Sequence, residues 1–136
     1  MARNVTLRSG MLVFIYVYTI IGAGGFGLGI IVAPDYIGSV FGVPKQEPMI
    51  LGVVGSVFLS FGLLSILGLR SPRKFLPVVL LQLCYKVIWF GGVVFPLLIR
   101  GQFPEYGIII ALIFAVYVIG DLFAIPFPYI FSKYEG

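Results

Sequence analysis

The sequence predicts an all-α membrane protein: an antiparallel bundle of four transmembrane helices that forms a single domain over residues 1–136. Of the 136 residues, 60% are hydrophobic and 10% are charged, and the mean hydropathy is +1.13. Soluble domains average about 25% charged residues, so this chain has too few of them to cover a surface exposed to water. The apolar residues also fall into four long runs, each long enough to cross a bilayer as a helix.

The first two spans are expected at residues 11–33 and 49–69. The first run ends at Pro34-Asp35, a strong turn signal, and it is longer than the apolar core of about 7–15 residues in a cleaved signal peptide. We therefore expect it to be retained as a helix. The segment over residues 35–48 is rich in Gly and Pro and predicts a loop with a short turn at the membrane interface.

The last two spans are expected at residues 75–99 and 106–125. A basic turn at residues 70–74 precedes span 3, and its proline suits the start of a helix. Prolines at positions 126 and 128 end span 4. All these runs are continuously apolar, whereas the strands of a transmembrane barrel alternate in polarity, so helices are favoured. The short loops make successive spans antiparallel.

The basic residues predict the orientation in the membrane. Six of them lie on the side of the termini and the turn between spans 2 and 3, and only two lie on the opposite side. The positive-inside rule therefore places both termini in the cytoplasm, with the protein in the cytoplasmic (inner) membrane. The net charge of +4 reflects this topology and does not indicate a nucleic-acid partner. The two groups are Arg3, Arg8, Arg70, Arg73, Lys74 and Lys133 against Lys45 and Arg100.

Small residues in spans 1 and 2 predict where helices pack. Because lipid supplies no hydrophobic force between helices, close backbone contact through small residues provides much of the attraction. We expect the two spans to pack tightly against each other, with a homodimer contact as the less favoured alternative. The expected packing positions are Ala23, Gly25, Gly27, Gly29, Gly52, Ser56 and Ser60.

Lys86, near the middle of span 3, is the most informative residue of the sequence. A charge at this depth costs about 2.5–3.5 kcal/mol on insertion scales, so it is usually paired and often functional. Asp121 on span 4 lies level with it, since both are roughly 21–22 Å from the loop that joins the two spans. We expect a Lys86–Asp121 ion pair inside the bundle. The expected polar site comprises Gln82, Tyr85, Lys86, Trp89, Tyr117 and Asp121.

The rest of the sequence offers few residues for catalysis or for metal binding. The sequence has no His, and this absence excludes bis-His haem ligation and His-containing zinc sites within this chain. It has one Cys, Cys84. No nucleophile lies beside a base. We therefore expect no catalytic residues, no metal and no cofactor, apart from a bound lipid or quinone-like molecule.

The layout resembles the small four-span bacterial membrane proteins of the DoxX-like kind. The similarity covers a Gly-rich first span, a Pro-containing loop and a second span, LGVVGSVFLSFGLL, that a basic turn follows. Some such proteins resemble accessory subunits of membrane oxidoreductases. The resemblance thus implies an accessory role but assigns no functional residue.

Three functions follow as expectations. The first is a non-enzymatic membrane protein, an accessory subunit or a binder of a lipid- or quinone-like ligand, with its polar site at Lys86 and Asp121. The second is a dimeric small-solute or proton-coupled transporter, and the third is a membrane enzyme that uses the same residues. The expected partners are membrane lipids and either a larger membrane complex or a second copy. An ion pair that only fixes the register of spans 3 and 4 is an equally open alternative.

Overall fold

The computed structural model describes residues 2–133, with side chains from residue 10 onward, and confirms the predicted all-α class. No strand occurs in this part of the chain. Four helices are long and apolar enough to cross a membrane, and their apolar stretches overlap the four predicted spans. They are Gly10–Val32, Pro48–Arg70, Leu76–Ile99 and Gly107–Ala124.

Spans 1 and 3 each contain a π-helical turn that the sequence did not reveal. Span 1 consists of α1 (Ala2–Thr19), η1 (Ile20–Gly24) and α2 (Gly25–Val32). Span 3 consists of α5 (Leu76–Trp89), η2 (Phe90–Val94) and α6 (Phe95–Ile99). A π-turn adds a residue to one turn, so the faces on either side of it no longer follow a single helical repeat. Both turns contain two glycines, which leave room for the wider backbone.

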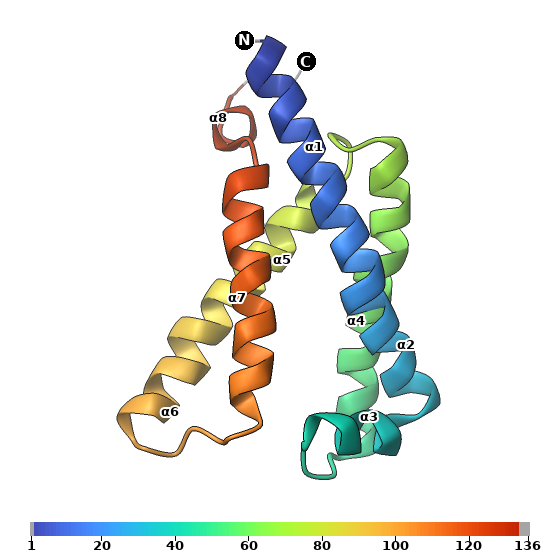
Figure 1. Cartoon of the computed structure of the whole chain (residues 1–136), viewed down its shortest axis with the longest axis vertical. Helices are drawn as coiled ribbons and strands as arrows, with labels where there is room; N and C mark the ends of the chain where they lie inside the picture. The colour runs from blue at the N-terminus through green and yellow to red at the C-terminus, as the bar shows by residue number, and fades with distance from the viewer. Residues whose placement is uncertain (1, 134–136) are drawn as a thin grey trace.

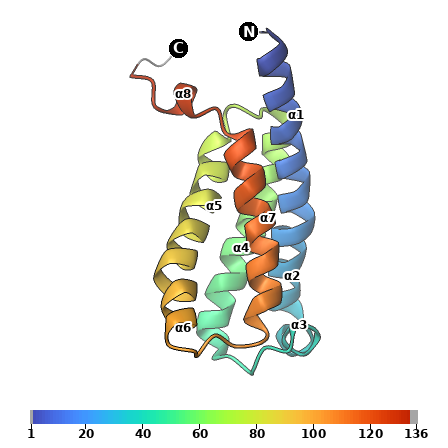
Figure 2. The ribbon, with the colours of Figure 1, turned by 60° about the vertical axis from the view of Figure 1, so that its left-hand side comes forward.

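The remaining elements are α4 (Pro48–Arg70), α7 (Gly107–Ala124), the connecting helix α3 (Pro34–Phe41) and the short α8 (Phe127–Ile130). Span 1 packs along α4 and, through α1, against α7, while α5 packs against α7. The helices thus form two pairs, span 1 with α4 and span 3 with α7, which diverge away from the termini (Figure 1). Figure 2 shows the same spans side by side, with α3 and α6 at the end opposite the termini.

Glycines bring span 1 and α4 into backbone contact. A Cβ atom at Gly62 would lie 2.5 Å from the Cα of Gly24, and one at Gly55 would lie 3.3 Å from the carbonyl oxygen of Gly27. A Cβ at Gly27 would in turn meet backbone atoms of α4, including the carbonyl oxygen of Gly55 at 2.6 Å. Only glycine permits this approach, which maximises van der Waals contact between the two helices.

This contact differs from the one that the sequence predicted. Of the expected positions, Gly27 lies in it, whereas Gly25 and Gly52 have open space where a Cβ would be. Ser56 and Ser60 are exposed, Ala23 lines a cavity described below, and Gly29 faces Ile37 of α3. The reason is geometric: positions seven apart, such as Gly55 and Gly62, stay on one face, whereas successive steps of four drift around the helix.

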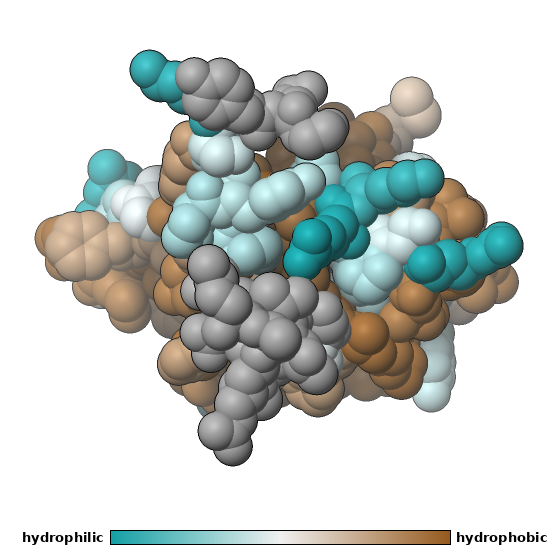
Figure 3. Space-filling model, turned by 90° about the horizontal axis from the view of Figure 1, so that it is seen from above, coloured by the Kyte–Doolittle hydropathy of each residue, from teal (hydrophilic) through white to brown (hydrophobic). Residues whose placement is uncertain are grey.

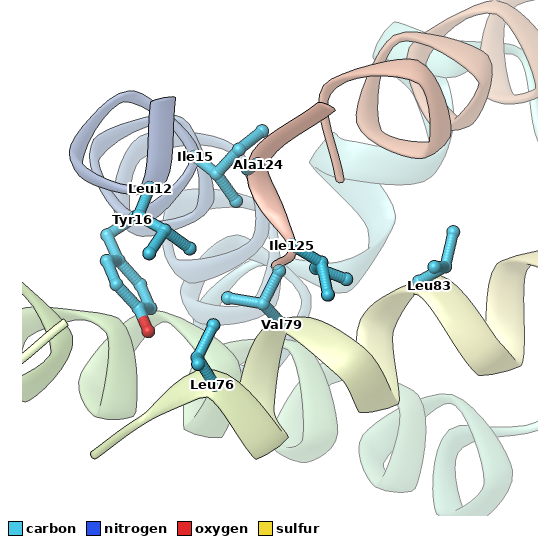
Figure 4. Packing of buried hydrophobic residues seen from close by; sticks show 8 residues of the cluster. All are labelled: Leu12, Ile15, Tyr16, Leu76, Val79, Leu83, Ala124 and Ile125. Atoms are coloured by element: carbon cyan, nitrogen blue, oxygen red, sulfur yellow. The ribbon is translucent and has the colours of Figure 1, made fainter. Parts of the chain in front are cut away.

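An apolar cluster closes the bundle at the end where the termini lie. Its side chains converge from span 1, from α5 and from the end of α7 (Figure 4). Tyr16 anchors the cluster, because its ring fills the notch over Gly68 and its hydroxyl donates a hydrogen bond of 2.7 Å to the carbonyl of Pro72. The members are Leu12, Ile15, Tyr16, Leu76, Val79, Leu83, Ala124 and Ile125.

Replacing Tyr16 with phenylalanine should lower the free energy of unfolding by about 1 kcal/mol, because the carbonyl of Pro72 loses its donor. Thermal unfolding in mild detergent measures the change. Tyr36→Phe is the matched control, since Tyr36 is 68% exposed and should tolerate the change. Equal melting of the two variants would show that the Tyr16 hydroxyl does not hold the turn.

The ends of the spans are organised for a membrane interface. The carboxylate of Glu47 caps α4 by accepting from the backbone N–H groups of Met49 and Ile50, at 3.0 and 2.8 Å. α3 ends at Gly42, whose φ of +69° favours glycine. Viewed from the end that carries the termini, hydrophilic residues gather on the surface and hydrophobic ones surround them (Figure 3). This pattern is that of a polar end above apolar sides.

Candidate functional site

Five polar side chains are almost completely buried within the described part of the bundle, at 0–1% exposure. They come from all four spans, and the two charged ones lie on spans 3 and 4. Buried polar groups inside a membrane protein are costly and therefore mark sites of structural or functional importance. The five are Thr19, Ser65, Gln82, Lys86 and Asp121.

Gln82 and Lys86 lie one turn apart on α5 and contact each other. The Lys86 Nζ donates to the Oε1 of Gln82 at 3.5 Å, and the hydroxyl of Thr19 lies 3.4 Å from the same oxygen. A hydroxyl has a single proton, and Thr19 makes a shorter bond of 2.7 Å to the carbonyl of Ile15. Gln82 therefore serves mainly as an acceptor for the ammonium group.

Three aromatic rings surround the ammonium of Lys86. Its Nζ lies 4.1 Å from the ring centroid of Tyr117, 4.6 Å from that of Tyr85 and 5.5 Å from that of Phe114. All three distances are within the range of cation–π attraction, which strengthens when water is excluded. The hydroxyl of Tyr117 donates to the carbonyl of Tyr18 at 3.1 Å and so fixes this ring. The cage replaces part of the hydration that the lysine loses.

Asp121 follows Tyr117 by one turn of α7 and is fully buried. Neither of its carboxylate oxygens has a hydrogen-bond partner among the described residues, and the amide nitrogen of Gln82 also lacks one. The sequence predicted a direct Lys86–Asp121 ion pair, but no hydrogen-bonded pair forms. The reason is that the lysine side chain turns toward the Tyr117 ring and Gln82. The two side chains nevertheless carry opposite charges in the same buried cluster, so each offsets part of the other's charge.

A cavity of about 1270 Å³ lies beside Lys86, in the half of the bundle away from the termini. All four spans contribute to its wall, together with α3 and the loops at that end, where the two helix pairs diverge (Figure 1). Among the described residues that line it, only Lys86, Asp35 and Lys45 carry a charge. Asp35 lies on α3 and Lys45 in the following loop, so Lys86 is the one charged group that a transmembrane span supplies.

The wall of the cavity is strongly aromatic. Phe61 stacks on Tyr85 with centroids 5.6 Å apart, and Trp89 meets Phe114 edge to face at 5.1 Å. These pairs belong to a continuous set of seven contacting rings with centroids 5.0–6.4 Å apart, and Tyr18 and Tyr117 form a separate pair at 4.5 Å. Flat apolar groups pack well against such surfaces. The rings of this aromatic wall are Tyr18, Phe26, Phe41, Phe58, Phe61, Tyr85, Trp89, Phe114 and Tyr117.

The structure divides the residues that the sequence singled out into two groups. Tyr85, Lys86, Trp89 and Tyr117 line the cavity, whereas Gln82 and Asp121 are buried without reaching it. The sequence reasoning missed several contributors, which are Thr19, Phe58, Phe61 and Phe114. Phe114 was detectable in principle, since it lies three residues before Tyr117 and thus on the same face of α7. Thr19 was detectable as a polar residue within an apolar run.

These features define a small four-helix membrane protein with a caged lysine beside an aromatic cavity. No protein family model matches the chain, and no curated protein or solved structure is significantly similar to it. The function must therefore be argued from the cavity and from the charged groups beside it.

Proposed function

We propose that this protein is a non-enzymatic binder of a hydrophobic, lipid- or quinone-like ligand. The observation that carries the proposal is the position of Lys86 in the wall of a cavity of about 1270 Å³ that is otherwise largely apolar. Ligand pockets typically combine apolar walls with a few polar groups that orient the ligand. The volume exceeds the usual range of about 300–1,000 Å³ for small-molecule pockets, which leaves room for an amphiphile with a tail.

The chemistry of the wall suggests how such a ligand would lie. The ammonium of Lys86 has three N–H donors, and Gln82 accepts only one of them. A polar head group that accepts a hydrogen bond would therefore sit against Lys86. The body of the ligand would then contact the aromatic wall on its way toward the outer end of the cavity, near α3.

The distribution of basic residues supports a particular orientation of the ligand site in the membrane. With both termini cytoplasmic, the cavity would open toward the opposite half of the inner membrane. The exposed apolar faces of the spans would contact membrane lipids. In this setting the protein would hold its ligand as an accessory subunit of a larger membrane complex or as a homodimer.

One-sided access supports binding over transport. The cavity lies on one side of Lys86, and on the other side the apolar cluster around Tyr16 closes the bundle (Figure 4). Alternating access would require a second conformation in which this cluster separates and water reaches Lys86 from the terminal side. A membrane enzyme would in addition need a reacting pair of groups, and within the described residues the hydrogen-bond and cation–π partners of the Lys86 ammonium are Gln82 and aromatic rings.

Native mass spectrometry of the protein purified in mild detergent tests this proposal. The wild type should retain a small hydrophobic molecule that the Lys86→Met/Asp121→Asn double variant loses, because the double variant lacks the head-group donor without leaving a buried charge. Lys74→Met is the matched control, since Lys74 lies in the basic turn outside the cavity and its loss should not affect retention. Equal retention by all three proteins would refute the proposal.

A further inference from the structure

We propose that the site selects an uncharged amphiphile whose head group is a hydrogen-bond acceptor, such as an ester or ketone carbonyl, over an anionic one. In this proposal Asp121 is a positioning residue that balances the charge of Lys86. The inference rests on the proposed function, and it adds the chemical class of the ligand.

The first argument is the charge balance of the buried cluster. Lys86 and Asp121 are the only charged side chains that are buried in the described part of the chain, at 1% and 0% exposure. Their formal charges sum to zero. A carboxylate or phosphate head group would add a net negative charge to a site of low dielectric constant, which is costly without a free counter-charge. An uncharged acceptor adds none.

The second argument is the order of the groups along the path of a ligand. Lys86 and Tyr117 line the cavity, and Asp121 lies one turn further along α7 without reaching it. A ligand head in the cavity would therefore lie nearer to Lys86, whose ammonium is held over the Tyr117 ring at 4.1 Å, than to the carboxylate. A carbonyl oxygen can accept from this donor without adding a charge to the cluster.

The third argument is the balance of charge at the outer end of the cavity. Asp35 and Lys45 are the charged residues that line this end, and their formal charges also cancel. An anionic head group would thus find no net positive charge at the outer end of the cavity and none at its inner end. A carbonyl needs only a donor, which Lys86 supplies.

A matched pair of probes tests the inference: bromonaphthoate and its methyl ester, which share a flat ring and differ in charge. Trp89 is the only tryptophan in the sequence and lines the cavity, so bromine quenching of its fluorescence reports binding in nanodiscs of uncharged lipid. The wild type should bind the ester at least about tenfold more tightly than the acid, given the cost of a buried unbalanced charge.

Asp121→Asn leaves a net positive charge in the cluster and should shift the selectivity toward the acid by about tenfold or more. Lys86→Met/Asp121→Asn restores a net charge of zero and removes the donor, so it should bind the ester more weakly and keep the preference over the acid. This double variant keeps the comparison possible if Asp121→Asn fails to fold.

A control separates binding from partitioning into lipid. In Trp89→Phe/Leu112→Trp the reporter lies at position 112, which is 63% exposed on the lipid-facing side of α7, and quenching there should not depend on the charge of the cluster. Tighter binding of the acid to the wild type would overturn the inference and leave the proposed ligand-binding function in place. Quenching of Trp89 by neither probe would overturn both.

Discussion

Gly27→Leu is expected to separate span 1 from α4 and to destabilise the protein by about 3 kcal/mol or more, since the added side chain cannot be accommodated by rotation. A Cβ at this position would meet the backbone of α4 at Gly55 and Phe58, and backbone atoms cannot move aside as a flexible side chain can. The association of the two helices depends on this close approach. Lipid solvates apolar side chains just as effectively as the protein interior does, so it provides no hydrophobic force between helices.

Unfolding in detergent, followed by circular dichroism or by proteolysis, measures this effect. Gly25→Leu and Gly52→Leu are the matched controls, because a Cβ at either position has open space around it. Both controls should change the free energy of unfolding by less than about 0.5 kcal/mol. A Gly27→Leu variant as stable as these controls would show that spans 1 and 2 do not pack through this face.

Lys86→Met is expected to destabilise the protein by about 3–5 kcal/mol, because it leaves the Asp121 carboxylate buried without a counter-charge. Asp121 is fully buried, and its two oxygens already lack a hydrogen-bond partner among the described residues, so the interaction with Lys86 is its main electrostatic compensation. The double variant Lys86→Met/Asp121→Asn should recover most of the loss, since it removes both charges together.

A double-mutant cycle on Lys86 and Asp121 measures this coupling. Lys74→Met is the control for loss of a lysine at an exposed site and should melt with the wild type. If the effects of the two single variants simply add in the double variant, the two charges are not coupled, and the argument for a balanced cluster fails.

The positions of the four spans were predictable because the bilayer imposes a simple rule. Every backbone polar group in hydrocarbon must be paired within its own segment, so an apolar run of about 20 residues becomes a helix whatever its neighbours are. The π-turns at Ile20–Gly24 and Phe90–Val94 were not predictable in this way. Their glycines permit such a turn but do not require it, and the packing of neighbouring helices decides.

The candidate site was predictable in part. Lys86 and Asp121 stand out because a charge in an apolar run is rare and costly, and the common loop sets their depth. The aromatic cage depended on more than sequence spacing. Phe114 and Tyr117 reach Lys86 from another helix, and only the crossing of α5 and α7 determines which of the many aromatic residues do so. The prediction of a direct ion pair was wrong for the same reason, since contacts with these rings and with Gln82 determine the direction of the lysine side chain.

By itself, the sequence determined that this is a membrane protein of four helices, where the apolar run of each span lies, and that spans 3 and 4 carry opposite charges. These properties follow from the free energy of transfer of each segment into lipid, which depends only on local composition. Only the tertiary structure decided which glycines touch, where the helix pairs diverge to leave a cavity, and which rings surround Lys86. These properties depend on contacts between segments far apart in the chain. Such contacts are determined by how the surfaces of the helices fit together, which the composition of each segment does not reveal.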